Sequence, residues 1–335
     1  MKKVKSILGS LIINNKAVII VIALAILLSC VSPIFLSSRN LLNVLRQVCT
    51  STILALGFTM VLGAGQIDLS VGSQVGLIGV VMVKLMAANV PVPVAILVGM
   101  LTGAVIGAVN AGIILTFKLP AFIVTLGTQQ ILRGTIYLIT GMVPQTEVKE
   151  SFVYLGQGYL FGIPVPIYIM LLMVVIVWFL VNRFKFGRYL LALGGNAEAA
   201  RVSGINTEKV MFQVFIAMGI CCSVASVVLT ARSASAQPTG GLNMEMDVIA
   251  AVVMGGTSMA GGVVNVVGAF LGSLIVGMVN NGLNLLGIDS NWQIVSKGVL
   301  ILFAVILDSV STKLMTNVRQ LSAVKNMKLK NKGKQ

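Results

Sequence analysis

Residues 165–206 read VPIYIMLLMVVIVWFLVNRFKFGRYLLALGGNAEAARVSGIN, and this stretch contains the two features that decide the fold. Its first 18 residues are apolar and uncharged, which is typical of a helix that crosses a lipid bilayer. Residues 183–206 then form a polar segment of small side chains with four basic residues among them. The stretch therefore predicts a transmembrane helix followed by a segment exposed to water.

The composition extends the first feature to the whole chain. Of the 335 residues, 57% are hydrophobic and only 10% are charged, and the mean hydropathy is +1.01. Soluble domains carry roughly 25% charged residues, so lipid must be the solvent. The apolar runs are continuous rather than alternating, which favours helices over a β-barrel. We expect an all-α, polytopic transmembrane helical bundle of about ten spans, because about 200 apolar residues suffice for ten helices.

The apolar runs divide the chain into a membrane domain at 17–312, with a short N-terminal segment at 1–16 and a basic tail at 313–335. We expect the tail to be disordered. The main water-exposed loop within the domain is 183–209. The predicted spans lie at about 17–36, 48–65, 71–89, 92–115, 120–140, 165–182, 210–230, 247–257, 263–287 and 292–311, and we expect outer segments at 37–47, 141–164 and 231–245.

The net charge of +15 is segregated along the chain. With ten spans, both termini lie in the cytoplasm and 17 of the 24 lysines and arginines fall on that side, as the positive-inside rule requires. A basic protein can also be a nucleic-acid-binding protein, but the tail offers neither aromatic residues nor a folded basic face. We therefore expect membrane lipid, and no nucleic acid, as a partner.

Two glycine-rich stretches interrupt the apolar pattern. They read LGAGQIDLSVGS at 62–73 and VMGGTSMAGG at 253–262. Paired broken helices are a sequence signature of the substrate region in transporters. The ten-span arrangement places both breaks on the cytoplasmic side, which does not match a simple inverted repeat.

The polar segment itself predicts a short helix. Asn196 is a favourable N-cap, Glu198 falls in the first turn, and Gly204 suits a left-handed C-terminal cap. The product is a helix of about seven residues, roughly 10 Å long. From the residues alone, the helix is either an ordinary connector at the membrane surface or a docking element for a partner.

Several sequence blocks resemble one family of transporters. RFKFGRYLLALGGNAEAARVSGIN is similar to the coupling-helix region of bacterial ATP-binding cassette (ABC) permeases of the ribose and simple-sugar group. GQIDLSVGS, SAQPTGGLNMEMDVIAAVVMGGTSMAGG and NNGLNLLG resemble three further blocks, and the likeness spans about 35–310. The resemblance implies a multi-pass permease of the bacterial cytoplasmic membrane. Residues implied in coupling to the ATPase are Gly194, Gly195, Asn196, Glu198, Ala199, Ala200, Arg201, Ser203, Gly204 and Ile205.

The same resemblance implies the partners. Two permease copies would form one pathway, two ATP-binding subunits would dock on the coupling helices, and an extracytoplasmic sugar-binding protein would deliver the substrate. The chain itself would be no enzyme, and it lacks the G-x-x-x-x-G-K-[ST] phosphate loop. Histidine is absent, which excludes imidazole metal ligands and histidine-based triads. We expect no cofactor and no metal, with ATP bound by the partner subunit.

Polar side chains within the apolar spans are candidates for the substrate pathway. Neutral amides can bond sugar hydroxyls without a counter-charge, but they can equally join two helices. Asp68 and Ser70 either line the pathway or cap the following helix. Arg133 either pairs with an acid such as Asp68 or Glu147, which we favour, or extends outward to the membrane surface. The candidates are Gln66, Asp68, Ser70, Asn110, Asn280, Asn281, Asn284 and Gln293.

The leading hypothesis is the membrane subunit of an ATP-driven importer of a neutral monosaccharide. Ribose is the first expectation, while galactose, xylose, allose, inositol and a furanosyl compound of the autoinducer-2 type stay open. A self-sufficient secondary transporter or channel is the alternative, with Asp68 as its one plausible coupling site. An intramembrane enzyme has little support, because the chain has no histidine and no paired central carboxylates.

Overall fold

The computed structural model describes residues 16–289, 291–302 and 305–306. In this part of the chain the only strands are two of two residues each, and the predicted all-α membrane-type fold is confirmed. The predicted N-terminal segment up to Asn15, the tail at 313–335 and the end of the last span lie outside the described residues. The elements are α2 (Lys16–Val31), α3 (Ser38–Gly63), α4 (Val71–Ala87), α5 (Val92–Phe117), α6 (Ala121–Thr140), α7 (Glu150–Gln157), β1 (Tyr159–Leu160), β2 (Ile163–Pro164), α8 (Val165–Asn182), α9 (Lys185–Gly195), α10 (Ala197–Val202), α11 (Thr207–Ser233), α12 (Met244–Met254) and α13 (Val266–Leu285); helical residues 291–302 follow.

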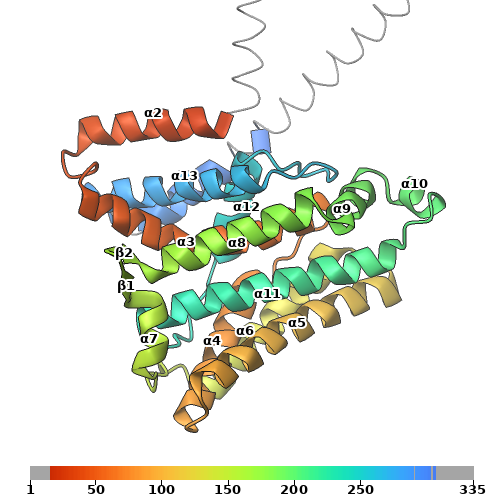
Figure 1. Cartoon of the computed structure of the whole chain (residues 1–335), viewed down its shortest axis with the longest axis horizontal. Coiled ribbons are helices and arrows are strands. Elements are labelled where there is room, and N and C mark those ends of the chain that lie inside the picture. Colours follow the sequence, from red (N-terminus) through yellow and green to blue (C-terminus); the bar gives the residue numbers. More distant parts are fainter. Residues whose placement is uncertain (1–15, 290, 303–304, 307–335) are drawn as a thin grey trace, which may run out of the picture.

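The long helices run side by side between two ends of the molecule (Figure 1). We call the end that carries α10 the coupling end; it also contains the helix breaks 64–70 and 255–265. We call the opposite end, with α7, β1 and β2, the hairpin end. Among the described residues, five helices are long and apolar enough to cross a membrane: α3, α5, α8, α11 and α13.

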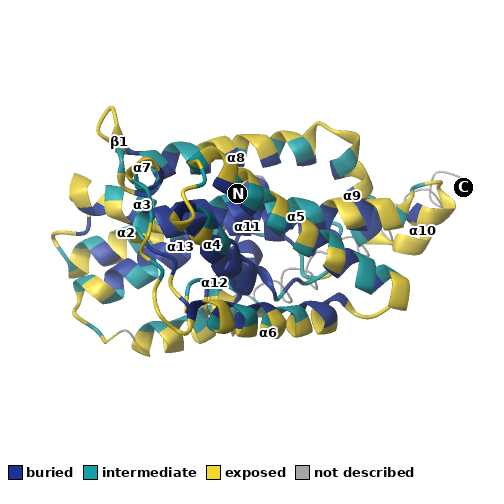
Figure 2. Ribbon diagram, turned by 90° about the horizontal axis from the view of Figure 1, so that it is seen from below, coloured by how far each residue is buried: buried dark blue, intermediate teal, exposed yellow. Residues whose placement is uncertain are grey.

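Two of these helices form the centre of the bundle. Most residues of α3 and α11 are buried, whereas only a minority of the residues of α5 and α8 are. Figure 2 shows α8 and α6 along opposite margins with their exposed faces outward. Large apolar side chains are exposed on the outer faces of α5 and α8, among them Leu101 and Val105 on α5 and Leu172 on α8. Such surfaces suit lipid contact, since a soluble monomer rarely exposes so large an apolar area.

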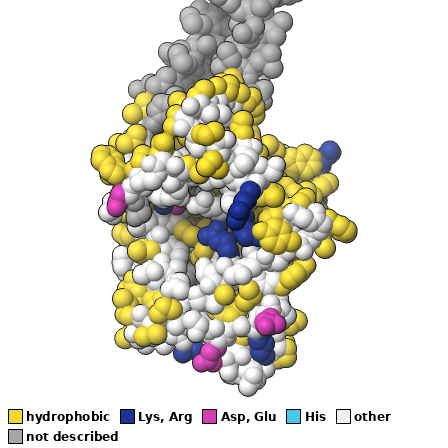
Figure 3. Space-filling view, turned by 90° about the vertical axis from the view of Figure 1, so that its left-hand side faces the viewer, with side chains coloured by type: hydrophobic (Ala, Val, Ile, Leu, Met, Phe, Trp, Pro, Cys, Tyr) yellow, Lys and Arg dark blue, Asp and Glu magenta, His cyan; other side chains and the backbone are white. Residues whose placement is uncertain are grey.

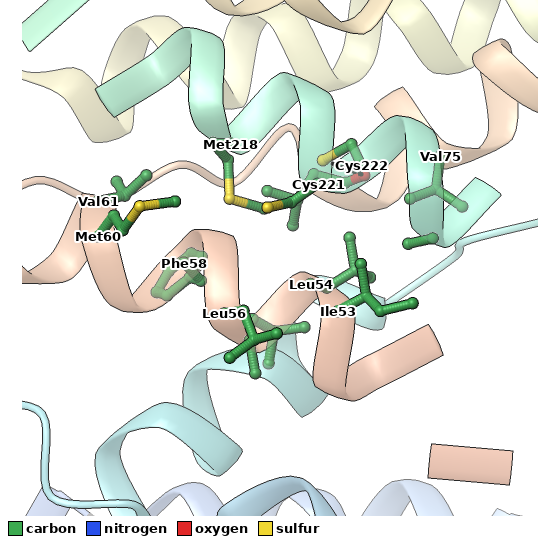
Figure 4. Packing of buried hydrophobic residues seen from close by; sticks show 14 of the residues in the cluster. Ile53, Leu54, Leu56, Phe58, Met60, Val61, Val75, Met218, Cys221 and Cys222 are labelled. Carbon is green, nitrogen blue, oxygen red and sulfur yellow. Dashed lines mark hydrogen bonds between the residues drawn. The ribbon is translucent and has the colours of Figure 1, made fainter. Parts of the chain in front are cut away.

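The contact between α3 and α11 is the inner core. Met218 and Cys221 of α11 point toward α3, where Gly57 leaves room for both side chains (Figure 4). Phe58 and Leu54 of α3 are fully buried beside them. The three buried cysteines, Cys49 of α3 and Cys221 and Cys222 of α11, are free thiols and act here as small apolar side chains.

Glycines bring α5 and α11 into close contact. A side chain at Gly103 would overlap the carbonyl oxygen of Gly219, and one at Gly219 would overlap that of Gly103. Gly107 lies against the Phe215 carbonyl in the same way, one turn further along. Gly103 and Gly107, four residues apart on one face of α5, therefore form a helix-packing surface.

Some boundaries differ from the sequence predictions. α3 begins at Ser38 rather than near 48, with Ser37 as a side-chain N-cap. Residues 37–47 looked like a loop because they are polar, but Asn40 exchanges two hydrogen bonds of 3.0 Å with the amide of Asn281 on α13. α7 lies within the predicted outer loop 141–164, and α9 was also missed.

The connection between α11 and α12 is the largest difference. Residues 231–245 were expected to form an outer loop, but the connection at 234–243 enters the bundle, and we call it the descending loop. Its residues 238–241 lie between α4 and α6, where the Arg133 guanidinium donates hydrogen bonds to the carbonyls of Pro238 and Gly240. α12 has 11 residues and is therefore only about 16 Å long, about half of a hydrocarbon core. The descending loop occupies the remaining depth, which explains why the predicted span at 247–257 has only 11 residues.

Replacing Gly103 with leucine should destabilise the bundle, because the side chain must force α5 away from α11; overpacking costs about 1–3 kcal/mol or more. We expect a clear fall in the melting temperature of the purified protein in detergent. Gly112→Leu is the control, since Gly112 is on the same helix and its nearest foreign atom is 3.8 Å away. An equal loss of stability in both variants would contradict this packing.

Candidate functional site

The predicted short helix of the polar segment is confirmed as α10. The Asn196 side chain accepts a hydrogen bond of 2.9 Å from the Ala199 backbone N–H, and Glu198 pairs with Arg201 on the exposed face. Gly204 ends the helix with φ +83°, a left-handed conformation that favours glycine. α10 projects at one extremity of the molecule (Figures 1 and 2), so a partner could contact it on several sides.

The predicted coupling residues divide by exposure. Ala200 is only 5% exposed and faces the bundle, whereas Glu198 and Arg201 face outward. Val202 was not among the candidates, yet it is an apolar side chain that is 81% exposed. The other exposed members of the predicted set are Gly195, Asn196, Ala199, Ser203 and Gly204, while Gly194 and Ile205 are half-buried.

Three segments far apart in sequence meet directly behind α10. The Gly262 N–H donates a hydrogen bond of 2.9 Å to the Gly63 carbonyl, joining the two helix breaks. Gly194 packs into this contact so closely that a side chain would overlap the Gly63 carbonyl oxygen. Gly65 and Gly261 complete the cluster, which we call the glycine junction. The two breaks therefore lie together, and the segment leading into α10 touches both.

The predicted pathway residues around the first break form a buried network. Asp68 accepts hydrogen bonds from the backbone and hydroxyl of Ser70 and from Gln74. Asn110 donates to the Ser70 hydroxyl at 3.1 Å and accepts from Thr128 at 2.7 Å. Asp68, Ser70 and Asn110 are all 0% exposed. The structure thus brings these three candidates together, and the network fixes the start of α4; a role in the pathway stays a prediction.

The amide candidates of the C-terminal region do not form one cluster. Asn281 is buried in its pair with Asn40, whereas Asn284 accepts a hydrogen bond of 2.7 Å from Gln293 on the exposed surface. The side-chain oxygen of Asn280 is buried without a hydrogen-bond partner among the described residues. These residues therefore lie in three different environments.

Gln66 lies apart from both groups, at an open cleft beside α10. The cleft has a volume of about 550 Å³, and its lining includes Lys118, Glu198 and Arg201. It opens at the coupling end between α10 and the turn that joins α5 to α6. This places Gln66 next to the predicted docking helix rather than deep in the bundle.

Sequence reasoning missed the role of Arg133. It was expected to pair with Asp68 or Glu147, but this prediction was wrong: its Nη1 donates to the carbonyls of Pro238 and Gly240 at 2.9 and 3.0 Å. Glu245 is buried at the start of α12, where it accepts a hydrogen bond of 2.9 Å from Gln129 of α6. Two side chains of α6 therefore hold this connection: Arg133 binds the descending loop, and Gln129 binds the start of α12.

A cavity of about 180 Å³ lies between the descending loop, α4 and α11. No signal in the hydropathy pattern pointed to it, because its lining comes from three separate segments. Among the described residues that line it, none carries a charge; they are Val75, Gly76, Leu229, Thr230, Ser233, Ser235, Ala236, Gln237, Thr239, Gly240, Gly241 and Met244.

The face at the hairpin end is basic near its middle. Figure 3 shows Lys and Arg side chains gathered there, with Asp and Glu at the margin. Arg46 stacks over the Tyr159 ring, with 4.9 Å between the guanidinium carbon and the ring centroid. Arg232 is close enough for its charge and that of Arg46 to repel each other. Two neighbouring cations on one face favour an acidic partner.

The sequence matches a family of transporter subunits over most of its length. Residues 40–305 match the family described as the branched-chain amino acid transport system / permease component, and the chain belongs to this family. No solved structure matches the chain.

The curated relatives include several sugar permeases. The ribose import permease protein of Escherichia coli K12 is 40% identical over 302 residues, covering 89% of this chain and 94% of the relative. The ribose import permease protein of Bacillus subtilis 168 is 42% identical, covering 85% and 89%. The D-allose transport system permease protein of E. coli K12 is 38% identical, covering 88% and 91%.

Gly194→Ala should uncouple the α10 segment from the helix breaks, because a methyl group would displace the Gly63 carbonyl from Gly262. We expect transport in the complete importer to fall by at least about fivefold, since overpacking costs about 1–3 kcal/mol and about 1.4 kcal/mol is a factor of ten. The Gly134→Ala variant on α6 is the control, because its side chain would meet nothing within 4 Å. Normal transport by both variants would show that the junction is not needed.

Proposed function

We propose that this protein is the membrane-spanning permease subunit of an ATP-binding cassette importer that moves a neutral monosaccharide into the bacterial cytoplasm. One observation carries the proposal: the segment leading into the exposed helix α10 is in backbone contact with the two helix breaks. A partner that moves α10 would therefore move both breaks. The family membership and the ribose, allose and xylose permeases among the relatives support the class of substrate.

We propose ten spans with both termini in the cytoplasm. The described helices α2, α3, α4, α5, α6, α8, α11, α12 and α13 and residues 291–302 supply ten segments in chain order. The last is joined to α12 by a hydrogen-bonded ion pair of 2.8 Å between Lys297 and Asp247, both mostly buried. Membrane-embedded charges require such partners, which supports placing residues 291–302 within the bundle.

The exposed face of α10 is the proposed contact with the ATP-binding subunit. Glu198, Arg201 and Val202 are its outward-facing side chains, with an apolar residue beside an ion pair. The backbone there is held by the Asn196 cap, so the face is preorganised. The permease binds no cofactor in this proposal; ATP binds to the partner.

The basic face at the hairpin end is the proposed contact with an extracytoplasmic binding protein. Arg46 and Arg232 would meet acidic side chains on that protein. A second copy of this chain would complete the pathway, as the exposed apolar faces of α5 and α8 leave ample surface for lipid and for a partner helix. D-ribose is the substrate that we propose to test first, followed by D-allose and D-xylose.

A secondary transporter or channel remains the competing function, with Asp68 as the coupling group. The hydrogen bonds that surround Asp68 reduce its suitability, because both of its carboxylate oxygens are already engaged. Uptake of labelled D-ribose into proteoliposomes separates the two functions. We expect uptake only with the ATP-binding subunit, the binding protein and ATP all present; uptake by the permease alone would refute the importer proposal.

Val202→Glu should weaken the association with the ATP-binding subunit, because it places a carboxylate in the proposed apolar contact. The fold should be unaffected, since Val202 is exposed. We expect co-purification of the two subunits to decrease and the ATP-driven uptake to decrease with it. Phe161→Glu, at the exposed tip of the β1–β2 hairpin, is the control at the opposite end and should leave co-purification unchanged.

A further inference from the structure

We propose that the cavity between the descending loop, α4 and α11 is a sugar-binding subsite on the transport pathway. This inference rests on the proposed function and assigns it residues that neither the hydropathy pattern nor the amide candidates indicated. The ligand is a neutral polyol, held by hydroxyl, amide and backbone groups of Thr230, Ser233, Ser235, Gln237 and Gly240.

The depth of the loop is the first argument. Gly240 and Gly241 lie against Gly76 and Gly72 of α4, and the guanidinium that holds them is on the fourth turn of α6. A non-helical backbone at membrane depth is tolerated only where it is buried in protein or lines a polar cavity. Transporter substrates bind near the middle of the membrane, at such interrupted segments. The position of this loop therefore fits a binding site rather than a surface connection.

The polar groups of the lining are the second argument. Thr230 is 4% exposed and lines the cavity, and the hydroxyls of Ser233 and Ser235 and the amide of Gln237 line it too. Each of these side chains can donate and accept hydrogen bonds. A ligand hydroxyl in the cavity could bond to them.

The neutral lining is the third argument, and it identifies the class of ligand. An amino acid carries an ammonium and a carboxylate, and each would need an opposite charge once removed from water. The described lining provides none, and the nearby Arg133 guanidinium is engaged by the Pro238 and Gly240 carbonyls. A polyol needs only donors and acceptors. The cavity therefore favours a sugar over the amino acids named in the family description.

The cavity volume is consistent with a small ligand. Its 180 Å³ lies below the 300–1,000 Å³ that is typical of sites for drug-sized molecules. Ser233 at the end of α11 and Gln237 and Thr239 of the following loop are exposed, so polar residues surround the cavity mouth. The loop is bridged to the hairpin end by Gln145 and Ala236. A sugar released by a binding protein at that end would meet polar groups along its route.

Thr230→Val tests the buried hydroxyl directly, in the complete importer reconstituted with its ATP-binding subunit and binding protein. We expect the initial rate of D-ribose uptake to fall by about fivefold, the factor expected for one hydrogen bond of about 1 kcal/mol. ATP hydrolysis stimulated by the loaded binding protein should be retained. Thr102→Val is the matched control, because that hydroxyl is bonded to Val98 within its own helix. Unchanged uptake by Thr230→Val would count against the subsite.

Thr239→Cys provides a second test that does not depend on removing a bond. The variant is made with Cys30→Ser, since Cys30 is the one exposed cysteine. A membrane-impermeant methanethiosulfonate should modify Cys at this position and block D-ribose uptake, and D-ribose-loaded binding protein with ATP should slow the modification. Full uptake after complete modification would overturn the proposal.

The wild-type importer separates failure of this inference from failure of the proposed function. Suppose that the wild-type importer takes up D-ribose with ATP, and that Thr230→Val and the modified Thr239→Cys variant take it up at the same rate. In that case only the location of the subsite is wrong. If wild-type uptake does not require the ATP-binding subunit, the proposed function itself fails. Competition by L-leucine, with no competition by D-allose or D-xylose, would refute the assignment to a neutral polyol.

Discussion

The hydrogen bond from the Gly262 N–H to the Gly63 carbonyl is the interaction on which the remaining arrangement depends. In a bilayer, every backbone polar group needs a partner within the protein, because the hydrocarbon offers none. Two helices that break at the same depth can satisfy each other only if their backbones touch. The absence of side chains at Gly63, Gly194 and Gly262 permits this contact, and it draws the α10 segment into the same cluster. One requirement of backbone chemistry thus joins the helix breaks to the exposed helix α10.

A similar constraint operates toward the hairpin end. The loop between α11 and α12 brings unpaired carbonyls into the bundle, and the Arg133 guanidinium supplies donors for two of them. The arginine is in turn tolerated inside the membrane domain because its charge is used in these bonds. α12 is short for the same reason, since the loop occupies the depth that a full helix would have crossed. The cavity lies where this loop, α4 and α11 do not fill the space between them.

These two arrangements divide the molecule by chemistry. At the coupling end the contacts are backbone to backbone and permit little adjustment, which suits the transmission of a displacement. Around the cavity, hydroxyl and amide side chains have rotatable donors and acceptors, which suits transient contact with a polyol. Between them lies the buried network of Asp68, Ser70 and Asn110, which fixes the start of α4. α4 therefore contacts both regions, with its first residues at the network and Val75 and Gly76 at the cavity.

The sequence by itself determined the class of fold, the helix at 165–182, the short helix after Asn196 and the position of both breaks. These features depend on local physics: apolar runs long enough for a bilayer, an N-cap, and glycine where the chain turns. Only the tertiary structure decided that Arg133 binds a loop rather than an acid, that residues 231–245 descend into the bundle, and that Asn40 pairs with Asn281. Such contacts join residues up to 241 positions apart, and a polar side chain has the same sequence signature in a loop, in a buried pair or at a cavity. Its partner is set by how the helices pack, which no short window of sequence contains.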